Sequence, residues 1–185
     1  MDCYQKKLAI SEESGDQYNI CVAHGNLGQL YRKIGQPEQA LDYLERAIAT
    51  GRERNIRFYL CDCLFFKADL LFALSRLEEC AAANAEVLAL AADIQRMSLA
   101  FQSRVLSAKI AARGDPARGL ALLTDLAGEF PGQEESATVE YEIFKLTGDG
   151  QARGRALAAY RALYGRTPHQ EYQDRIREME AAVPS

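Results

Sequence analysis

The feature that most constrains how this chain folds is an internal repeat with a period of about 40 residues. Side-chain sizes recur at matching positions, so that Gly28 and Tyr31 correspond to Ala68 and Leu71 in the next copy, and looser copies follow. A single repeat of this length cannot bury its own hydrophobic face, so neighbouring copies have to stack on one another. We therefore expect a linear array of similar units.

Each copy is predicted to be a pair of helices joined by a tight turn. The sequence is rich in the helix formers Ala, Leu, Glu, Arg and Gln. Gly28 and Ala40 are placed where two helices cross, because only small side chains let backbones approach to about 8 Å. Large side chains such as Leu44 lie about a helical turn away and fill the remaining space. The predicted turns contain Gly35, Ser75, Gly114 and Gly148.

These residues resemble the tetratricopeptide repeat family, whose pattern is Leu-Gly-x-x-Tyr in the first helix and Ala-x3-Phe-x2-Ala in the second. The long period is similar to that of the family's extended-helix branch. The resemblance implies an all-α, right-handed superhelical α-solenoid of helix–turn–helix repeats. An ordinary helical bundle would need several coincident matches at this spacing. The matching residues are Leu27, Gly28, Tyr31, Ala40, Leu44 and Ala47, with Leu44 in place of Phe.

The chain is predicted to be a single repeat domain spanning residues 1–185. Residues 1–15 are interpreted as the second helix of a truncated repeat, which leaves the N-terminal end uncapped. Residues 166–185 are expected to form a capping helix over the last repeat. The apolar stripe of that helix consists of Tyr172, Ile176, Met179 and Val183. The full repeats are placed at 16–54, 55–94, 95–131 and 132–165.

Charge and composition argue against several classes of partner. The chain carries 26 acidic and 22 basic residues, a net charge of −4, whereas nucleic-acid binders usually have a basic excess. No apolar run is long enough for a membrane-spanning helix, and no signal peptide is recognisable. Five cysteines form a poor disulfide framework and favour a reducing, cytoplasmic setting. We therefore expect no membrane and no nucleic-acid partner, with a helical-repeat RNA binder as the weakest alternative.

Neither catalysis nor metal binding is predicted. The two histidines, His24 and His169, are not accompanied by any nucleotide-binding, zinc-protease or serine-hydrolase motif. His24 falls at a core position of its repeat, which favours a structural role. Cys61 and Cys63 diverge on a helix and lack a second ligand pair at zinc spacing. Cys21 and Cys61 are equivalent repeat positions and are interpreted as small buried side chains, so no cofactor and no metal is expected.

The family resemblance implies a binding surface on the first helix of each repeat, which lines a concave groove. Side chains spaced i, i+4, i+7 and i+11 share that face. Amide side chains there are suited to hold a peptide backbone, and aromatic side chains are suited to form pockets. Gly25 and Gln29 stand where a clamp for an acidic tail would need other residues. The predicted groove residues are Val22, Asn26, Gln29, Arg32, Lys33, Asp62, Phe66, Asp69, Phe72, Phe101 and Arg104.

Two functions remain open at this point. The first is a non-enzymatic scaffold that binds a peptide or helix of another protein in the groove. The alternative is a regulatory or dimerisation module of a larger bacterial signalling protein, linked to a cyclase or kinase. The half-repeat at residues 1–15 and the segment from Leu146 to Asp149, which is similar to repeats that close such regulators, favour the alternative. A homodimer would then form through the uncapped N-terminal end.

Overall fold

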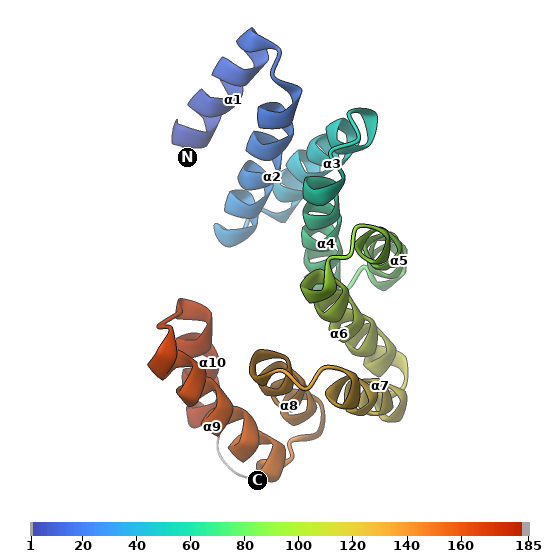
Figure 1. Ribbon diagram of the computed structural model, residues 1–185, viewed down its shortest axis with the longest axis vertical. Helices are drawn as coiled ribbons and strands as arrows, with labels where there is room; N and C mark the ends of the chain where they lie inside the picture. The colour runs from blue at the N-terminus through green and yellow to red at the C-terminus, as the bar shows by residue number, and fades with distance from the viewer. Residues whose placement is uncertain (1, 183–185) are drawn as a thin grey trace. The chain divides into compact units, whose positions relative to one another are not determined.

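The computed structural model describes residues 2–182, which fold into helices joined by short turns, with no strand among them (Figure 1). The predicted all-α repeat fold is confirmed. The chain divides into two compact units, an N-terminal unit ending at Leu106 and a C-terminal unit beginning at Ser107. The helices are α1 (Asp2–Ser14), α2 (Gln17–Lys33), α3 (Pro37–Glu53), α4 (Arg57–Ala73), α5 (Leu77–Asp93), α6 (Met97–Gly114), α7 (Pro116–Glu129), α8 (Gln133–Thr147), α9 (Gly150–Arg166) and α10 (Gln170–Ala181).

The N-terminal unit repeats one helix and one turn with high regularity. Helices α2 to α5 each contain 17 residues. Each helix from α1 to α5 ends in a turn residue with left-handed backbone, and the next N–H donates to a carbonyl five residues back at 2.8–3.0 Å. This is the Schellman arrangement, which satisfies carbonyls at the helix end. The left-handed residues are Gly15, Gly35, Asn55, Ser75 and Gln95.

Small residues bring the helices of this unit into close contact. Helix α2 packs against α3 and also contacts α4. A Cβ atom on Gly28 would lie 2.7 Å from Cγ of Leu44 and 3.2 Å from the carbonyl oxygen of Ala40. A Cβ atom on Gly25 would lie 2.7 Å from the hydroxyl of Tyr59. The predicted helix crossing at Gly28 and Ala40 is therefore confirmed, and Gly25 makes a second crossing.

Two cysteines play the same structural part in successive repeats. The thiol of Cys21 donates to the carbonyl of Ala47 at 3.2 Å, and that of Cys61 donates to the carbonyl of Val87 at 3.8 Å. Both side chains are fully buried, and burial raises the pKa of each thiol to about 11. They join the first helix of a pair to the second. The surrounding core includes Leu27, Leu44, Ile48, Leu60, Leu64 and Leu70.

The C-terminal unit has less uniform elements. Helices α7, α8, α9 and α10 contain 14, 15, 17 and 12 residues and pack in chain order. Asp115 caps α7 ahead of Pro116, and Gly148 has the left-handed backbone that ends α8. The predicted C-terminal helix is present as α10, with Met179 of its apolar stripe fully buried. Val183, also assigned to that stripe, lies outside the described residues.

Candidate functional site

All the predicted groove residues lie in the N-terminal unit, on α2, on α4 and on the first part of α6. These are the first helices of three consecutive pairs. Helices α2 and α4 contact each other directly, so the predicted residues on these two helices lie on neighbouring elements. The arrangement of side chains on this surface decides what it can bind.

A tyrosine that the sequence interpretation missed closes the seam between α2 and α4. The hydroxyl of Tyr59 donates to the carbonyl of Val22 at 3.0 Å and to Oδ1 of Asn26 at 3.2 Å. Burial raises the pKa of Tyr59, so its hydroxyl keeps its proton. Because Asn26 accepts through its oxygen, its amide nitrogen can still donate to a ligand. The seam therefore places a polar group at a half-buried position.

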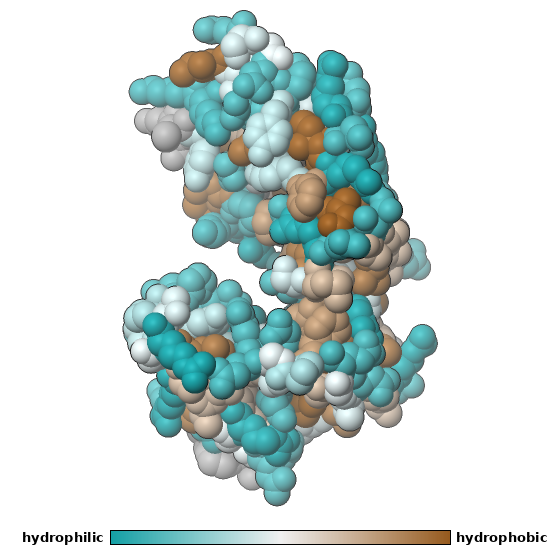
Figure 2. Space-filling model, viewed as in Figure 1, coloured by the Kyte–Doolittle hydropathy of each residue, from teal (hydrophilic) through white to brown (hydrophobic). Residues whose placement is uncertain are grey.

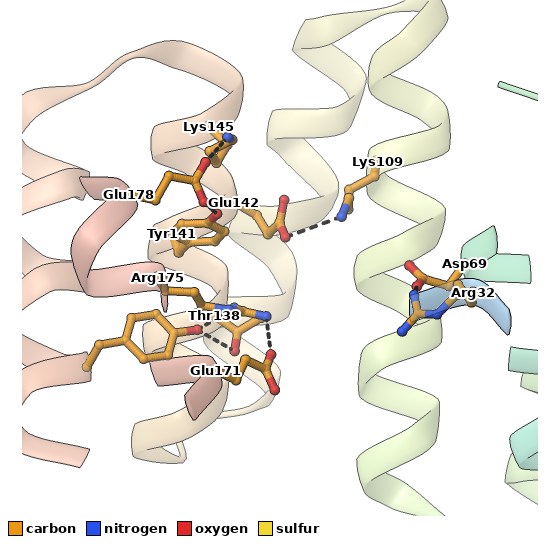
Figure 3. Close-up of polar contacts among 11 residues, drawn as sticks. Arg32, Asp69, Lys109, Thr138, Tyr141, Glu142, Lys145, Glu171, Arg175 and Glu178 are labelled. Carbon is orange, nitrogen blue, oxygen red and sulfur yellow. Dashed lines mark hydrogen bonds and ion pairs between the residues drawn. The ribbon is translucent and has the colours of Figure 1, made fainter. Parts of the chain in front are cut away.

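Three charged residues of the surface, Arg32, Asp62 and Asp69, are paired within the unit. Arg32 contacts Asp69 at 2.5 Å (Figure 3), and Nε of Arg32 donates to Gln29 at 3.2 Å. Asp62 forms an ion pair at 2.7 Å with Arg96, which lies just after the end of α5. These ion pairs remain partly exposed, so each contributes little to the free energy of unfolding. Their main effect is to reduce the net charge that the surface presents to a ligand.

The aromatic residues of the predicted groove differ in exposure. Phe66 and Phe72 are half-buried, and the ring of Phe66 lies 6.4 Å from that of Phe65. Phe101 is only 5% exposed. A ligand therefore has direct access to Phe66 and Phe72, whereas Phe101 packs among its neighbours. The remaining two predicted residues also differ, since Lys33 is exposed and Arg104 is half-buried.

A row of exposed apolar side chains borders this surface and was missed by the sequence interpretation. Tyr18, Phe58 and Met97 are 58%, 62% and 64% exposed and stand in the first turns of α2, α4 and α6. We call these three residues the rim row. On the face drawn in Figure 2, the N-terminal unit is mainly hydrophilic with separate hydrophobic spots. Tyr18 and Phe58 could have been found from the repeat, because they lie 40 residues apart and precede Val22 and Asp62 by four residues each.

One rim residue is held in place by a neighbouring repeat. The guanidinium of Arg96 lies 6.0 Å from the ring centroid of Phe58, and it donates to the carbonyl of Phe58 at 3.1 Å. Because the same guanidinium pairs with Asp62, one arginine fixes both a rim residue and a groove residue. A side chain restrained in this way loses less conformational entropy on binding.

The residues weighed for catalysis and metal binding have structural surroundings. His24 is 8% exposed, its ring lies 6.0 Å from that of Tyr43, and burial followed by the charge of Arg46 lowers its pKa. Cys63 is buried beside Gly25. Within residues 4–182, no group of three or more acidic, cysteine or histidine side chains is arranged to hold a metal ion. None of the described helices is long and apolar enough to cross a membrane.

Comparison with known families gives one match. The model of the family described as tetratricopeptide repeat matches residues 2–53, which include α1, α2 and α3. No curated protein matches the chain significantly. Proteins with these repeats generally use them to bind other proteins, and the family is typically a non-enzymatic scaffold. Residues 2–53 are therefore similar to the tetratricopeptide repeat family.

Proposed function

We propose that the N-terminal unit is a non-enzymatic module that binds a segment of another protein on the surface formed by α2, α4 and the start of α6. The observation that carries this proposal is the rim row of Tyr18, Phe58 and Met97. Single exposed apolar residues are common on proteins, but three in the first turns of the first helices of successive pairs form an ordered surface. Such a surface suits a ligand that crosses the helices in turn.

The spacing of the rim row limits the sequence of that ligand. Packed neighbouring helices lie about 8–10 Å apart. An extended peptide advances about 3.3 Å per residue, so every third residue meets the next helix. We therefore expect a ligand with apolar side chains at positions i, i+3 and i+6. Its backbone would be held by the amides of Asn26 and Gln29, which offer both donors and acceptors.

The charge pattern limits the ligand further. Arg32 already pairs with Asp69, and Asp62 already pairs with Arg96. A strongly acidic or basic peptide would have to compete with these internal partners, and the competition lowers its affinity. The surface thus favours a weakly charged, apolar segment, in keeping with the missing acidic-tail clamp.

The test uses random peptides displayed on phage and selected on the wild-type chain. A Tyr18→Ser/Phe58→Ser/Met97→Ser variant removes the rim row, and because all three side chains are exposed, folding should be retained. We expect the selected peptides to bind this variant about tenfold more weakly or worse. The control is Ile34→Ser/Leu74→Ser, which changes exposed apolar residues at the opposite ends of α2 and α4. Equal binding to both variants, or no enrichment of peptides, would exclude the proposal.

Self-association through α1 is a second candidate, consistent with a regulatory or dimerisation role. Ile10 is 65% exposed on this helix, and Tyr4 is also exposed. Large apolar side chains on a helix that packs against α2 are suited to pair with a second copy. Light scattering should then detect dimers of the wild-type chain and monomers of an Ile10→Lys variant. If the molar mass of the wild-type chain stays that of a monomer at every concentration, this role is excluded.

A further inference from the structure

Helix α10 is attached to the C-terminal unit through one fully buried apolar side chain, two partly buried ones and several polar ones. Met179 is its one fully buried residue, and the carbonyl of Met179 accepts from Nε of Arg153 at 2.7 Å. Arg161 on α9 forms a further ion pair with Glu180 at 2.7 Å. Tyr172 and Ile176 are partly buried against the same core, and the charged residues of α10 add directional contacts to this apolar packing.

Arg175 of α10 occupies an aromatic cage formed by α8 and α9. Its guanidinium lies 4.9 Å from the ring centroid of Tyr141 and 5.3 Å from that of Tyr160. It also donates to the hydroxyl of Tyr160 and, at 2.7 Å, to Glu171 of its own helix. The negative faces of aromatic rings attract a cation, and Arg is the usual one. The two tyrosines are themselves in edge-to-face contact, with centroids 6.2 Å apart.

The hydroxyl of Tyr160 is oriented to accept from a cation. The hydroxyl of Thr138 donates to the carbonyl of Glu134 at 2.9 Å. Its oxygen is therefore the acceptor in the 3.2 Å contact with Tyr160, whose proton is used in that bond. The oxygen of Tyr160 is left to accept from Arg175. The bond between Thr138 and Tyr160 joins α8 to α9 and does not involve α10.

A second anchor lies three residues after Arg175. Glu178 accepts hydrogen bonds from the hydroxyl of Tyr141 and from Lys145, both on α8 (Figure 3). These bonds, first that of Lys145 and then that of Tyr141, lower the pKa of Glu178. Tyr141 therefore contacts both an arginine and a glutamate of α10. Arg175, Glu178 and Met179 together form one recognition face on α10.

The attachment of α10 is weak compared with the helix pairs beneath it. A helix of 12 residues is marginal in water without its neighbours. The Glu178–Lys145 and Arg161–Glu180 pairs are about half exposed, and exposed ion pairs add little. Segments with few buried apolar contacts open more readily than the rest of a domain. Detachment of α10 would expose the aromatic cage and the adjacent apolar surface that Met179 covers.

We propose that α10 is a displaceable internal ligand, and that the α8–α9 surface beneath it binds a helix of another protein. That helix would carry an arginine, an acidic residue three positions later and an apolar residue four positions later, the pattern of Arg175, Glu178 and Met179. Positions i, i+3 and i+4 lie on one face of a helix, so one turn presents the complete pattern. This surface lies within the C-terminal unit and does not depend on the rim row.

The experiment uses the full-length chain and, as probe, a fluorescent peptide with the sequence of residues 167–182. An Arg175→Ala/Met179→Ala variant removes two of the three recognition-face residues from the tethered helix and leaves the residues of the cage unchanged. The tether keeps wild-type α10 at a high effective concentration, which blocks the peptide. We therefore expect fluorescence anisotropy to report binding to the variant at least about tenfold tighter than to the wild-type chain.

Two peptide variants test whether the arginine is recognised. A peptide carrying Arg175→Ala should bind the double variant about tenfold more weakly or worse, because the charge-assisted bond and the cage contacts are lost. A peptide carrying Arg177→Ala is the matched control and should bind like the original, since Arg177 is exposed and contacts only Asp174. Circular dichroism checks that the double variant stays folded. The proposal would be overturned if the peptide did not bind the folded double variant. It would also be overturned if the Arg175→Ala and Arg177→Ala peptides lost affinity equally.

Discussion

The two units share helix-pair architecture but stabilise it by different means. In the N-terminal unit, a left-handed turn residue follows each helix from α1 to α5, at positions 15, 35, 55, 75 and 95. In the C-terminal unit, Gly148 is the left-handed position among the described residues, and helix lengths vary from 14 to 17 residues before α10. Backbone turns set the period of the first unit, and side-chain contacts hold the second.

The same contrast is found between the helices. Gly28 lets Leu44 approach the backbone of α2, so that an added Cβ would collide with it. In α9, Gly154 has open space around it, and the adjoining helix is held by Arg175 and Tyr160 instead. The family motif is thus a close-packing motif. Its match to residues 2–53 falls within the unit where close packing sets the geometry.

The largest effect should come from breaking the interlock of Gly28 and Leu44. Leu44 is fully buried, so Leu44→Ala should lower the free energy of unfolding by about 3–5 kcal/mol. Gly28→Ala alone should lower it by about 1–3 kcal/mol, because the new methyl group meets Cγ of Leu44 at 2.7 Å. Urea unfolding followed by circular dichroism measures both changes.

The double variant makes this prediction specific. With Leu44 truncated, the methyl group of Gly28→Ala has room, and Ala is favoured over Gly inside a helix by about 1 kcal/mol. The two changes should therefore combine to less than their sum. Gly154→Ala is the control and should stabilise the chain slightly in either background. If the double variant lost as much free energy of unfolding as the two single variants together, Gly28 and Leu44 would not be interlocked.

The second largest effect should be confined to the C-terminal unit. Met179 is fully buried, so Met179→Ala should weaken the attachment of α10 by about 2–4 kcal/mol. Because α10 is a terminal helix, the loss should increase hydrogen exchange in α10 and leave α2 and α3 unchanged. Tyr172→Ala, which removes a partly buried residue of the same helix, should have a smaller effect. Faster exchange in α2 and α3 would show that the two units unfold together.

The parts of the fold that could be predicted from the sequence are those in which a single residue determines the local backbone geometry. Gly35 and Gly148 have the left-handed backbone expected at their turns, and Ser75 has it without being glycine. The crossing at Gly28 was predictable because a small residue stood where the repeat needed one. Asn55 and Gln95 were missed as turn residues, because neither type signals a left-handed backbone as strongly as glycine does.

The candidate site was less predictable, because pairing partners come from other repeats. The repeat register placed Arg32, Asp62 and Asp69 on helix faces, but only the packing of α2 on α4 brings Arg32 to Asp69. Phe101 was placed on the groove by a register one residue too short, because the turns at Asn55 and Gln95 are 40 residues apart and make Phe101 equivalent to the buried Cys61. Spacing predicts which residues share a face, and packing decides which of them remain accessible.

A third prediction concerns the pH dependence of the N-terminal unit. Burial, and then the charge of Arg46, lower the pKa of His24 below its value of 6.5 in an unfolded chain, against opposing effects of Glu12 and Asp42. The folded state therefore binds fewer protons than the unfolded state, and stability falls as the pH drops through about 6.5. Urea midpoints measured near pH 7.5 and pH 5.5 should show this loss in the wild-type chain.

The matched variants are His24→Phe, which removes the buried histidine, and His169→Asn, which replaces an exposed histidine. The first should reduce the pH-dependent loss, and the second should leave it unchanged. Because a single proton is involved, the effect should be smaller than that of truncating Leu44 or Met179. An unchanged loss in His24→Phe would assign the pH dependence to other groups.

The smallest effect tests the turns that set the period of the N-terminal unit. Gln95 has a φ of 55°, a backbone that is unfavourable for a residue with a Cβ atom and freely adopted by glycine. Gln95→Gly relieves this strain but adds flexibility to the unfolded chain, so the net gain should be about 0.5 kcal/mol. Gly35→Gln, the reverse change at an equivalent turn, should lower stability by about 1 kcal/mol. Urea unfolding of the two variants should give shifts of opposite sign, and shifts of the same sign would show that these turns are not equivalent.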